Sequence, residues 1–328
     1  MEACDSDVRR TSPIAMTRSA GSLITVIVVC LCGCRPANHY LVHPRQPADA
    51  TITWSEDVQR DQLLIHLEGA RPPGPGPFPT VLVHPEGGKT AGDMRGIIWD
   101  LAGDGYLAIA ADYQRRIDGE YRRNLFAWRS ESDATAIVDV AVQHPEVDQQ
   151  RIAVLGFSQG GVYSLLIAAY APERIRAVVA YYPVTDFSRW LDQPQDNVFR
   201  QWAFGVIRWY FKRESGAKSE AEFQAMLREA SPYDVANSIR APVLLVHGDS
   251  DTTAPVEESQ RMADQLTKDG RDVTLLVIPG GVHIFNFRQP QQAQAAWQTT
   301  LEWLAQHMAQ PHPSALDLGA AMQQHDDR

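Results

Sequence analysis

The chain of 328 residues has no cysteine after Cys34, because its four cysteines all lie within the first 34 residues. This absence excludes a disulfide framework and a cysteine-based metal site from the rest of the chain. Positive charge is also scarce, since 30 Lys and Arg stand against 40 Asp and Glu and give a formal net charge of −10. Nonspecific nucleic-acid binding requires a basic surface, so we expect no nucleic-acid partner.

The start of the chain lacks an apolar run of about 20 residues, the length needed to span a bilayer. The shorter run from Leu23 to Leu31 follows three arginines, as in a signal peptide. It ends in Leu31-Cys32-Gly33-Cys34, which resembles the lipobox of bacterial lipoproteins. The resemblance implies that Cys34 is lipidated and that acyl chains anchor the protein to a membrane of the cell envelope. A plain secretory signal, giving a secreted or periplasmic protein, and an uncleaved segment are the alternatives.

The chain divides into four parts by composition. Residues 1–34 are predicted to be the signal peptide with its lipobox, and either Met1 or Met16 can be the start. Residues 35–49 contain three prolines and no hydrophobic period, which predicts a tether. Residues 50–309 are predicted to form one domain, and residues 310–328 a loose tail.

The pattern of that domain predicts an α/β fold. From residue 80 to residue 182, short apolar runs alternate with helix-like runs, which implies a mostly parallel sheet with helices on both faces. Two β-like runs at 50–54 and 62–67 predict an antiparallel pair at one sheet edge. The alternation breaks at residues 187–230, where we predict a helical cap insertion. Its many aromatic side chains are expected to pack the cap rather than to line a pocket, and the arginines around 115–123 are expected in an exposed loop.

A serine motif follows the central strand of this pattern. In Gly156-Phe-Ser158-Gln-Gly160, the glycines permit a sharp turn between an apolar strand and a helix, with Ser158 at its apex. The backbone N–H of Gln159 is then a candidate donor to an oxyanion. A second donor is expected in the loop that precedes Gly87-Gly88, where we assign it to the backbone N–H of Glu86. An ordinary strand-to-helix turn is the alternative interpretation of both segments.

Two further candidates follow strands later in the chain. Asp251 comes after the apolar run 242–246 and His283 after the run 273–279. The carboxyl ends of parallel strands share one crevice, so Ser158, Asp251 and His283 are predicted to meet there as nucleophile, acid and base. Asp249 is a weaker candidate for the acid.

These motifs identify the chain as similar to α/β-hydrolases of the dienelactone hydrolase and prolyl-oligopeptidase-like group. The resemblance runs from about Thr80 to Met308 and is most specific at four segments: Gly156–Gly161, Ser231-Pro232, His247-Gly-Asp-Ser-Asp251 with Pro255, and Pro279-Gly-Gly-Val-His283. In that group the acid lies three residues after the Gly of His-Gly, which selects Asp251. Peptidases of the group usually carry Tyr where this chain has Gln159, and dienelactone hydrolases use Cys where it has Ser158.

The resemblance implies a serine hydrolase that uses neither a metal nor an organic cofactor. Cleavage of a carboxylic ester through an acyl-enzyme is the leading hypothesis, and a prolyl-oligopeptidase-like serine peptidase is the alternative. The expected partners are a small ester or peptide substrate and, through the lipid anchor, a membrane. A catalytically silent binding protein of the envelope is the alternative from another class, because a fold alone does not secure a function. The oligomeric state stays open.

Overall fold

The computed structural model describes residues 42–117, 119–122, 131–194 and 197–309. Within these residues nine strands form a single sheet in the order β1-β2-β4-β3-β6-β7-β8-β9, with β5 paired to β4. The strands are β1 (Ile52–Arg60), β2 (Leu63–Arg71), β3 (Phe78–His84), β4 (Leu107–Ile117), β5 (Glu120–Arg122), β6 (Val147–Phe157), β7 (Ala177–Tyr181), β8 (Val243–Gly248) and β9 (Val273–Ile278).

The pairing confirms a mostly parallel sheet. All neighbours from β4 through β3, β6, β7, β8 to β9 are parallel, whereas β1 pairs antiparallel with β2, and β2 with β4. The predicted antiparallel pair at the sheet edge is therefore present, although its strands extend to Arg60 and Arg71. The four strands β3, β6, β7 and β8 are flanked by strands on both sides, and their ends toward Ser158 are buried.

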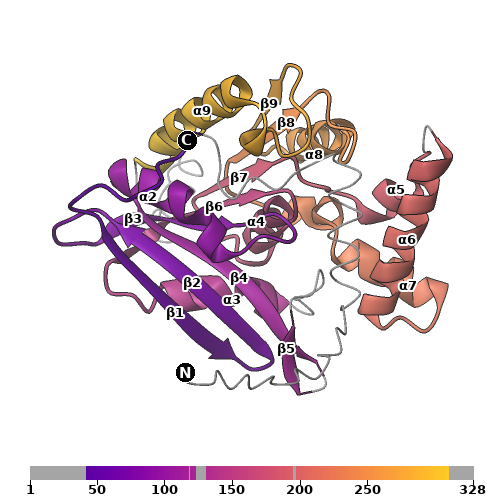
Figure 1. Ribbon diagram of the computed structural model, residues 1–328, viewed down its shortest axis with the longest axis horizontal. Coiled ribbons are helices and arrows are strands. Elements are labelled where there is room, and N and C mark those ends of the chain that lie inside the picture. The colour runs from indigo at the N-terminus through magenta and orange to yellow at the C-terminus, as the bar shows by residue number, and fades with distance from the viewer. Residues whose placement is uncertain (1–41, 118, 123–130, 195–196, 310–328) are drawn as a thin grey trace, which may run out of the picture.

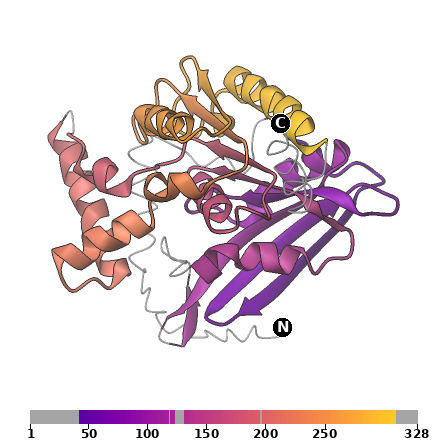
Figure 2. The same ribbon diagram turned by 180° about the vertical axis from the view of Figure 1, so that it is seen from behind.

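Helices cover both faces of the sheet (Figures 1 and 2). One face packs against α2 (Arg95–Gly103) and α9 (Pro290–Met308), and the other against α3 (Glu131–Ala141), α4 (Gln159–Tyr170) and α8 (Glu257–Lys268). Each face of the sheet carries one cluster of buried apolar side chains, and alternate residues of each buried strand contribute to opposite clusters. Val154 packs on the α4 face, for example, and Leu155 on the α9 face. This arrangement confirms the predicted α/β class.

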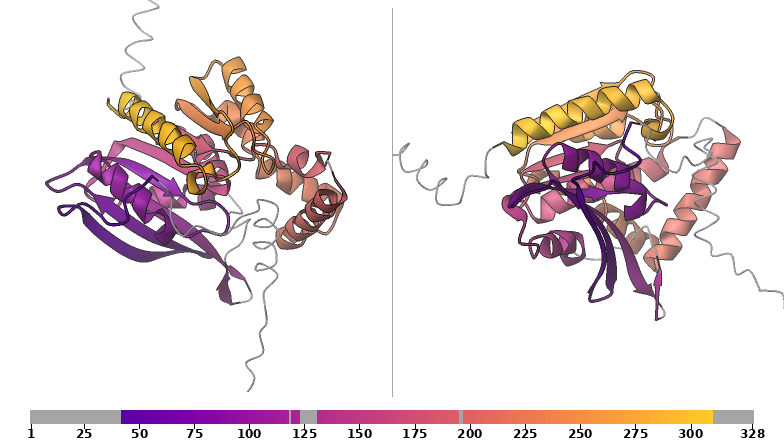
Figure 3. Two further views of the ribbon diagram at one scale, coloured as in Figure 1. Left: turned by 45° about the horizontal axis from the view of Figure 1, so that its top comes forward. Right: turned by 60° about the vertical axis from the view of Figure 1, so that its left-hand side comes forward.

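The described residues of the insertion predicted at 187–230 form three helices. They are α5 (Phe187–Asp192), α6 (Val198–Ser215) and α7 (Glu220–Glu229), followed by the 3-10 helix η2 (Pro232–Ser238). The side chains of Asn197 and Ser219 accept backbone N–H groups and cap α6 and α7 at their N-termini. Figure 3 shows these helices standing beside the domain, away from the β1–β2 edge.

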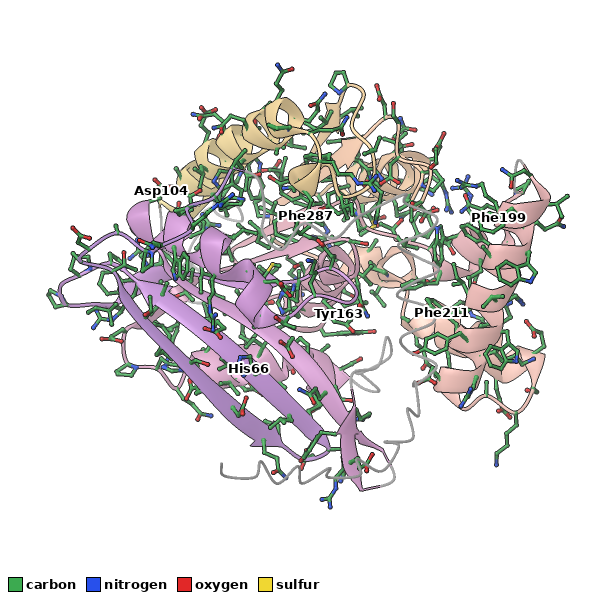
Figure 4. All side chains as sticks on the ribbon, viewed as in Figure 1. His66, Asp104, Tyr163, Phe199, Phe211 and Phe287 are labelled. Carbon is green, nitrogen blue, oxygen red and sulfur yellow. The ribbon has the colours of Figure 1, made fainter. Side chains whose placement is uncertain are left out.

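The aromatic residues of the insertion divide into two groups. Trp190, Phe204 and Phe211 are buried in a cluster formed within the cap, as predicted. The packing prediction is wrong for the other group, because Phe199, Trp202 and Trp209 are 60%, 58% and 58% exposed. Figure 4 places Phe211 on the side of α6 that faces the domain and Phe199 at the outer end of the helix.

Other expectations also need correction. Arg115 lies in β4 rather than in an exposed loop, and its guanidinium pairs with Asp133 at 2.9 Å. The chain is packed on the domain already at His43, a buried residue of the predicted tether, whose Nδ1 lies 3.0 Å from Asp100 Oδ2. The predicted signal peptide, Cys34 and the C-terminal tail lie outside the described residues.

Candidate active site

Ser158 lies between β6 and α4 in a strained backbone conformation, with φ 49° and ψ −112°. A positive φ is unfavourable for a residue with a Cβ, so its surroundings must hold this conformation. The Ser158 N–H donates to the carbonyl of Tyr181 at the end of β7 (2.9 Å), and the Ser158 carbonyl accepts from the N–H of Val162 in α4 (3.1 Å). The serine therefore stands at a turn that is fixed from both sides, as the glycine pattern predicts.

The loop after β3 runs directly beside this turn. A Cβ added to Gly160 would lie 2.1 Å from the carbonyl oxygen of His84 and 2.6 Å from that of Pro85. Only glycine permits this approach, which brings the first turn of α4 against the loop. Glu86 is the next residue of the loop and is buried. The two segments that carry the predicted oxyanion donors, the backbone N–H groups of Gln159 and Glu86, are therefore adjacent.

The Asp251 side chain is buried in the loop between β8 and α8. Its Oδ1 accepts the N–H groups of Thr253 and Ala254, each at 2.9 Å, so the carboxylate closes a turn of its own loop. Its Oδ2 accepts from His283 Nδ1 at 2.6 Å. Burial alone would raise the pKa of Asp251, but the charge of His283 and hydrogen bonds from His247 and His283 outweigh burial and hold that pKa below its usual value. Asp251 is therefore ionised at neutral pH.

His283 lies in the loop that follows β9. A Cβ added to Gly248 would lie 2.1 Å from the carbonyl oxygen of Gly281, so the end of β8 and this loop are in backbone contact. The N–H of Ser250 also donates to the Gly281 carbonyl at 3.0 Å. The loop that holds the histidine is thus fixed to the strand that leads into the acid.

Three side chains from different loops form one hydrogen-bonded chain. His283 Nε2 lies 3.1 Å from Ser158 Oγ, and its Nδ1 lies 2.6 Å from Asp251 Oδ2. An ionised carboxylate can only accept, so Nδ1 carries the proton, and Nε2 presents a lone pair to the serine hydroxyl. This is the arrangement that a general base needs in order to take the proton of the serine.

Asp249, the weaker candidate for the acid, has a different environment. Its exposed carboxylate accepts the N–H of Gly280 (2.8 Å) and the hydroxyl of Ser250 (3.0 Å). It therefore connects the loops after β8 and β9. The geometry favours Asp251 as the partner of His283.

Two residues near the histidine were given no role in the sequence analysis. Tyr182 is fully buried with φ 38°, and its ring lies 5.0 Å from that of His283 between centroids. His247 is also fully buried; its Nε2 donates to the carbonyl of Ala254 at 2.7 Å and lies 3.4 Å from Asp251 Oδ2. The His-Gly motif is the signal that could have indicated His247, whereas Tyr182 has none beyond its place after a strand.

The described part of the chain contains no group of three or more His, Cys, Asp and Glu side chains placed to hold a metal ion. In the same ranges, none of the helices combines the length and apolar character needed to cross a membrane.

Comparison with known proteins gives a consistent family. Residues 100–311 match the model of the prolyl oligopeptidase family. The "Uncharacterized peptidase YtmA" of Bacillus subtilis is 30% identical over 201 residues, which cover 60% of this chain and 72% of that protein. A "Putative carboxymethylenebutenolidase" of Yersinia pestis is 28% identical over 249 residues, or 71% of this chain and 79% of the relative.

Solved structures share the fold. The Pyrococcus horikoshii acylaminoacyl peptidase superposes with a TM-score of 0.63 at 16% identity. The superposition covers 79% of this chain but 42% of the peptidase, so the chain spans less than half the length of that enzyme.

Proposed function

Because the chain belongs to the prolyl oligopeptidase family, we propose that it is a serine hydrolase that cleaves a carboxylic ester or a related acyl bond. Ser158 is the nucleophile, His283 the general base and then the general acid, and Asp251 the acid that orients the imidazole. The observation that carries the proposal is the continuous hydrogen-bonded chain from Ser158 Oγ through His283 to Asp251.

The first half of the reaction forms an acyl-enzyme. Ser158 Oγ attacks the carbonyl carbon of the substrate while its proton moves to His283 Nε2. The imidazolium that results is stabilised by the Asp251 carboxylate. The backbone N–H groups of Gln159 and Glu86 are proposed to donate to the oxyanion of the tetrahedral intermediate, and the N-terminus of α4 favours negative charge at that place. His283 then protonates the leaving alkoxide or amine, and the carbon–leaving-group bond breaks.

The second half releases the acyl group. A water molecule takes the place of the leaving group, and His283 removes its proton as the water oxygen attacks the acyl carbon. Collapse of the second tetrahedral intermediate returns the proton from His283 to Ser158 Oγ and frees the acid. Proton and electron balance is closed within the triad, so these steps call on no cofactor.

Ester and peptide cleavage use the same machinery, and the relatives carry names from both classes. The name "Putative carboxymethylenebutenolidase" of the Yersinia pestis relative supports ester cleavage, and the name "Uncharacterized peptidase YtmA" supports peptide cleavage. Gln159 favours an ester, because the peptidases that the sequence resembles usually carry Tyr at that position. A peptidase remains the second candidate.

The test uses the purified chain with short and medium p-nitrophenyl esters and with a Gly-Pro anilide. Ser158→Ala is expected to lower ester turnover on the order of 10⁴-fold or more, because it removes the nucleophile. Asp251→Asn is expected to lower kcat by about 10⁴-fold, because the amide favours the wrong imidazole tautomer. Its matched control, Asp249→Asn, keeps turnover close to that of the wild type.

Each outcome of that test separates two hypotheses. Anilide cleavage that depends on Ser158, without ester turnover, would replace the esterase with a peptidase. Equal loss in the two aspartate variants would overturn the assignment of the acid. A wild-type chain that neither turns over these substrates nor reacts with a fluorophosphonate would be a silent binding protein.

We further propose that Cys34 is lipidated and that the protein is held at a membrane of the cell envelope. The support is the sequence from Leu23 to Cys34, with its short apolar run and lipobox-like end. Cells fed a palmitate analogue should label the wild-type chain and not Cys34→Ala. Equal labelling of the two chains would show that Cys34 is not the lipidation site.

A further inference from the structure

The backbone carbonyls next to Asp251 are held by three separate parts of the molecule. The Thr252 carbonyl accepts from the guanidinium of Arg200 in α6, and the Thr253 carbonyl accepts from Trp190 Nε1 in α5 at 2.7 Å. The Ala254 carbonyl accepts from His247 Nε2 at the end of β8 at 2.7 Å. Two of these three donors belong to the cap and only one to the sheet.

The opposite side of the same loop is bound by the carboxylate of the acid. Asp251 Oδ1 accepts the N–H groups of Thr253 and Ala254, the residues whose carbonyls Trp190 and His247 hold. A displacement of Thr253 or Ala254 therefore moves the carboxylate that pairs with His283. The loop has no regular secondary structure that could fix it independently of these contacts.

Trp190 is rigidly placed to act on this loop. Its side chain is buried, and its ring packs edge-on against Phe204 at 5.2 Å and Phe187 at 6.2 Å between centroids. Ala254 is fully buried in the same cluster of cap residues. The loop that carries the acid is thus part of the cap's own core.

A second contact ties the base of the cap to the helix that follows the acid loop. Glu258 in the first turn of α8 accepts the N–H groups of Thr185 and Asp186 through Oε2, each at 3.0 Å, directly before α5 begins. Arg261 of α8 lies 3.2 Å from the Asp186 carboxylate. The cap and the segment from Asp251 into α8 are therefore held as one body.

We propose that Trp190 is a positioning residue for Asp251, so that the triad is fully assembled only while α5 is docked on the acid loop. The inference rests on the proposed function for the role of Asp251. The nucleophile and the histidine loop are positioned by contacts within the sheet and its loops, whereas the loop of the acid is held by the cap as well as by His247. A substrate or partner that displaces the cap changes the rate of the chemical step and not only access to the site.

The decisive variant is Trp190→Phe in the full chain, which keeps an aromatic ring in the cap cluster and removes the N–H that holds the Thr253 carbonyl. Its matched control is Trp209→Phe on the exposed side of α6, where the ring packs against Arg213. Steady-state kinetics on the ester are expected to show a fall in kcat between about tenfold and a hundredfold for Trp190→Phe, with little change in KM. The control variant keeps both constants.

The pH dependence separates positioning from a general loss of structure. A carboxylate that no longer faces Nδ1 stabilises the imidazolium less, so the acid limb of kcat/KM moves to lower pH in Trp190→Phe. The NMR signals of the His283 ring, assigned by their absence in His283→Gln, are expected to change in Trp190→Phe, because the contact of Nδ1 with Asp251 is disturbed. A variant that only unfolds in part would lose amplitude without this movement.

The inference and the proposed function fail in different ways. Wild-type kinetics and wild-type NMR signals of the His283 ring in Trp190→Phe would overturn the inference and leave the serine hydrolase standing. A wild-type chain without Ser158-dependent turnover would contradict the function, while the NMR signals of the His283 ring would still decide whether the cap positions Asp251. If Trp190→Phe does not fold, Arg200→Gln, which removes the donor to the Thr252 carbonyl, takes its place. It is expected to change the pH profile of kcat/KM and the NMR signals of the His283 ring in the same way, by a smaller amount. A wild-type pH profile and wild-type ring signals in Arg200→Gln would overturn the inference.

Discussion

In the α/β core, the central strands bury apolar side chains on both faces, so that Phe157, Tyr181 and Leu82 have no exposed surface. The cap differs, because only one side of α6 is covered: Phe204 and Phe211 are buried while Trp202 and Trp209 are more than half exposed. In the α/β core, helices cover both faces of the sheet. The cap is one layer of helices with a separate, smaller apolar cluster.

This difference explains how the site is divided between the two regions. Ser158 is held by β6, β7 and α4, and the loop of His283 by backbone contact between Gly248 and Gly281. Both depend on the double-sided core. The loop of Asp251 is bound by Trp190 and Arg200 of the cap as well as by His247 of the core. The acid is therefore the part of the triad most sensitive to the less covered region.

The largest stability effects should separate core from cap. Phe157→Ala removes a fully buried ring that packs against Tyr181 at 4.8 Å, and we expect the free energy of unfolding to fall by about 3–5 kcal/mol. Phe223→Ala removes an equally buried ring from the cap. Its effect on global unfolding is limited to the free energy that holds the cap in place, so we expect a smaller fall. Urea unfolding measures both values.

Hydrogen exchange distinguishes the two responses by location. In Phe223→Ala, faster exchange should be confined to α5, α6 and α7, whereas Phe157→Ala should speed exchange across the central strands. Equal losses of stability, with faster exchange across the sheet in both variants, would show that the cap and the core unfold as one unit. The cap would then not be the less stable region of the two.

The sequence was sufficient for the core because each strand leaves a local signal. The apolar runs, the glycines around Ser158 and the chain order of Ser158, Asp251 and His283 all follow from short segments, and the structure brings these three side chains into contact. The periodicity of neighbouring residues carries this information, since a parallel sheet aligns the carboxyl ends of its strands.

The cap could not be predicted to the same depth. Trp190 and Thr253 are 63 residues apart, and their hydrogen bond depends on how the insertion docks rather than on any local pattern. The composition of α6 likewise could not separate its buried aromatic residues from its exposed ones, because both sides of the helix carry aromatic side chains. The sequence therefore predicts Asp251 as the acid but not the cap residues that hold its loop.

The two regions also differ in the sign of their response to acid. In the core, burial lowers the pKa of His84 from its ordinary value of 6.5 to about 3, and Nε2 of its ring lies 2.9 Å from the Tyr113 hydroxyl oxygen. At the base of the cap, burial raises the pKa of Glu258, despite the hydrogen bonds that its carboxylate accepts. Acid therefore opposes burial of His84, whereas it favours burial of Glu258.

The smallest expected change in the free energy of unfolding comes from protonation of the His84 ring. In the unfolded chain His84 binds a proton below pH 6.5, whereas in the folded chain it does so only near pH 3. The contribution of His84 to the stability of the fold is therefore complete above pH 6.5 and decreases as the pH falls. Between pH 7 and pH 5 the loss amounts to about 2 kcal/mol. His84→Phe keeps a ring of similar shape and cannot titrate, so its free energy of unfolding should fall less over this range by that amount.

Urea unfolding of both chains at the two pH values measures the difference, and parallel pH dependences would mean that His84 is not the group through which acid weakens the core. Because Glu258 contributes with the opposite sign, protection from hydrogen exchange, taken relative to the slower intrinsic exchange at pH 5, should fall first in β3 and β6, next to His84, and not at the base of the cap.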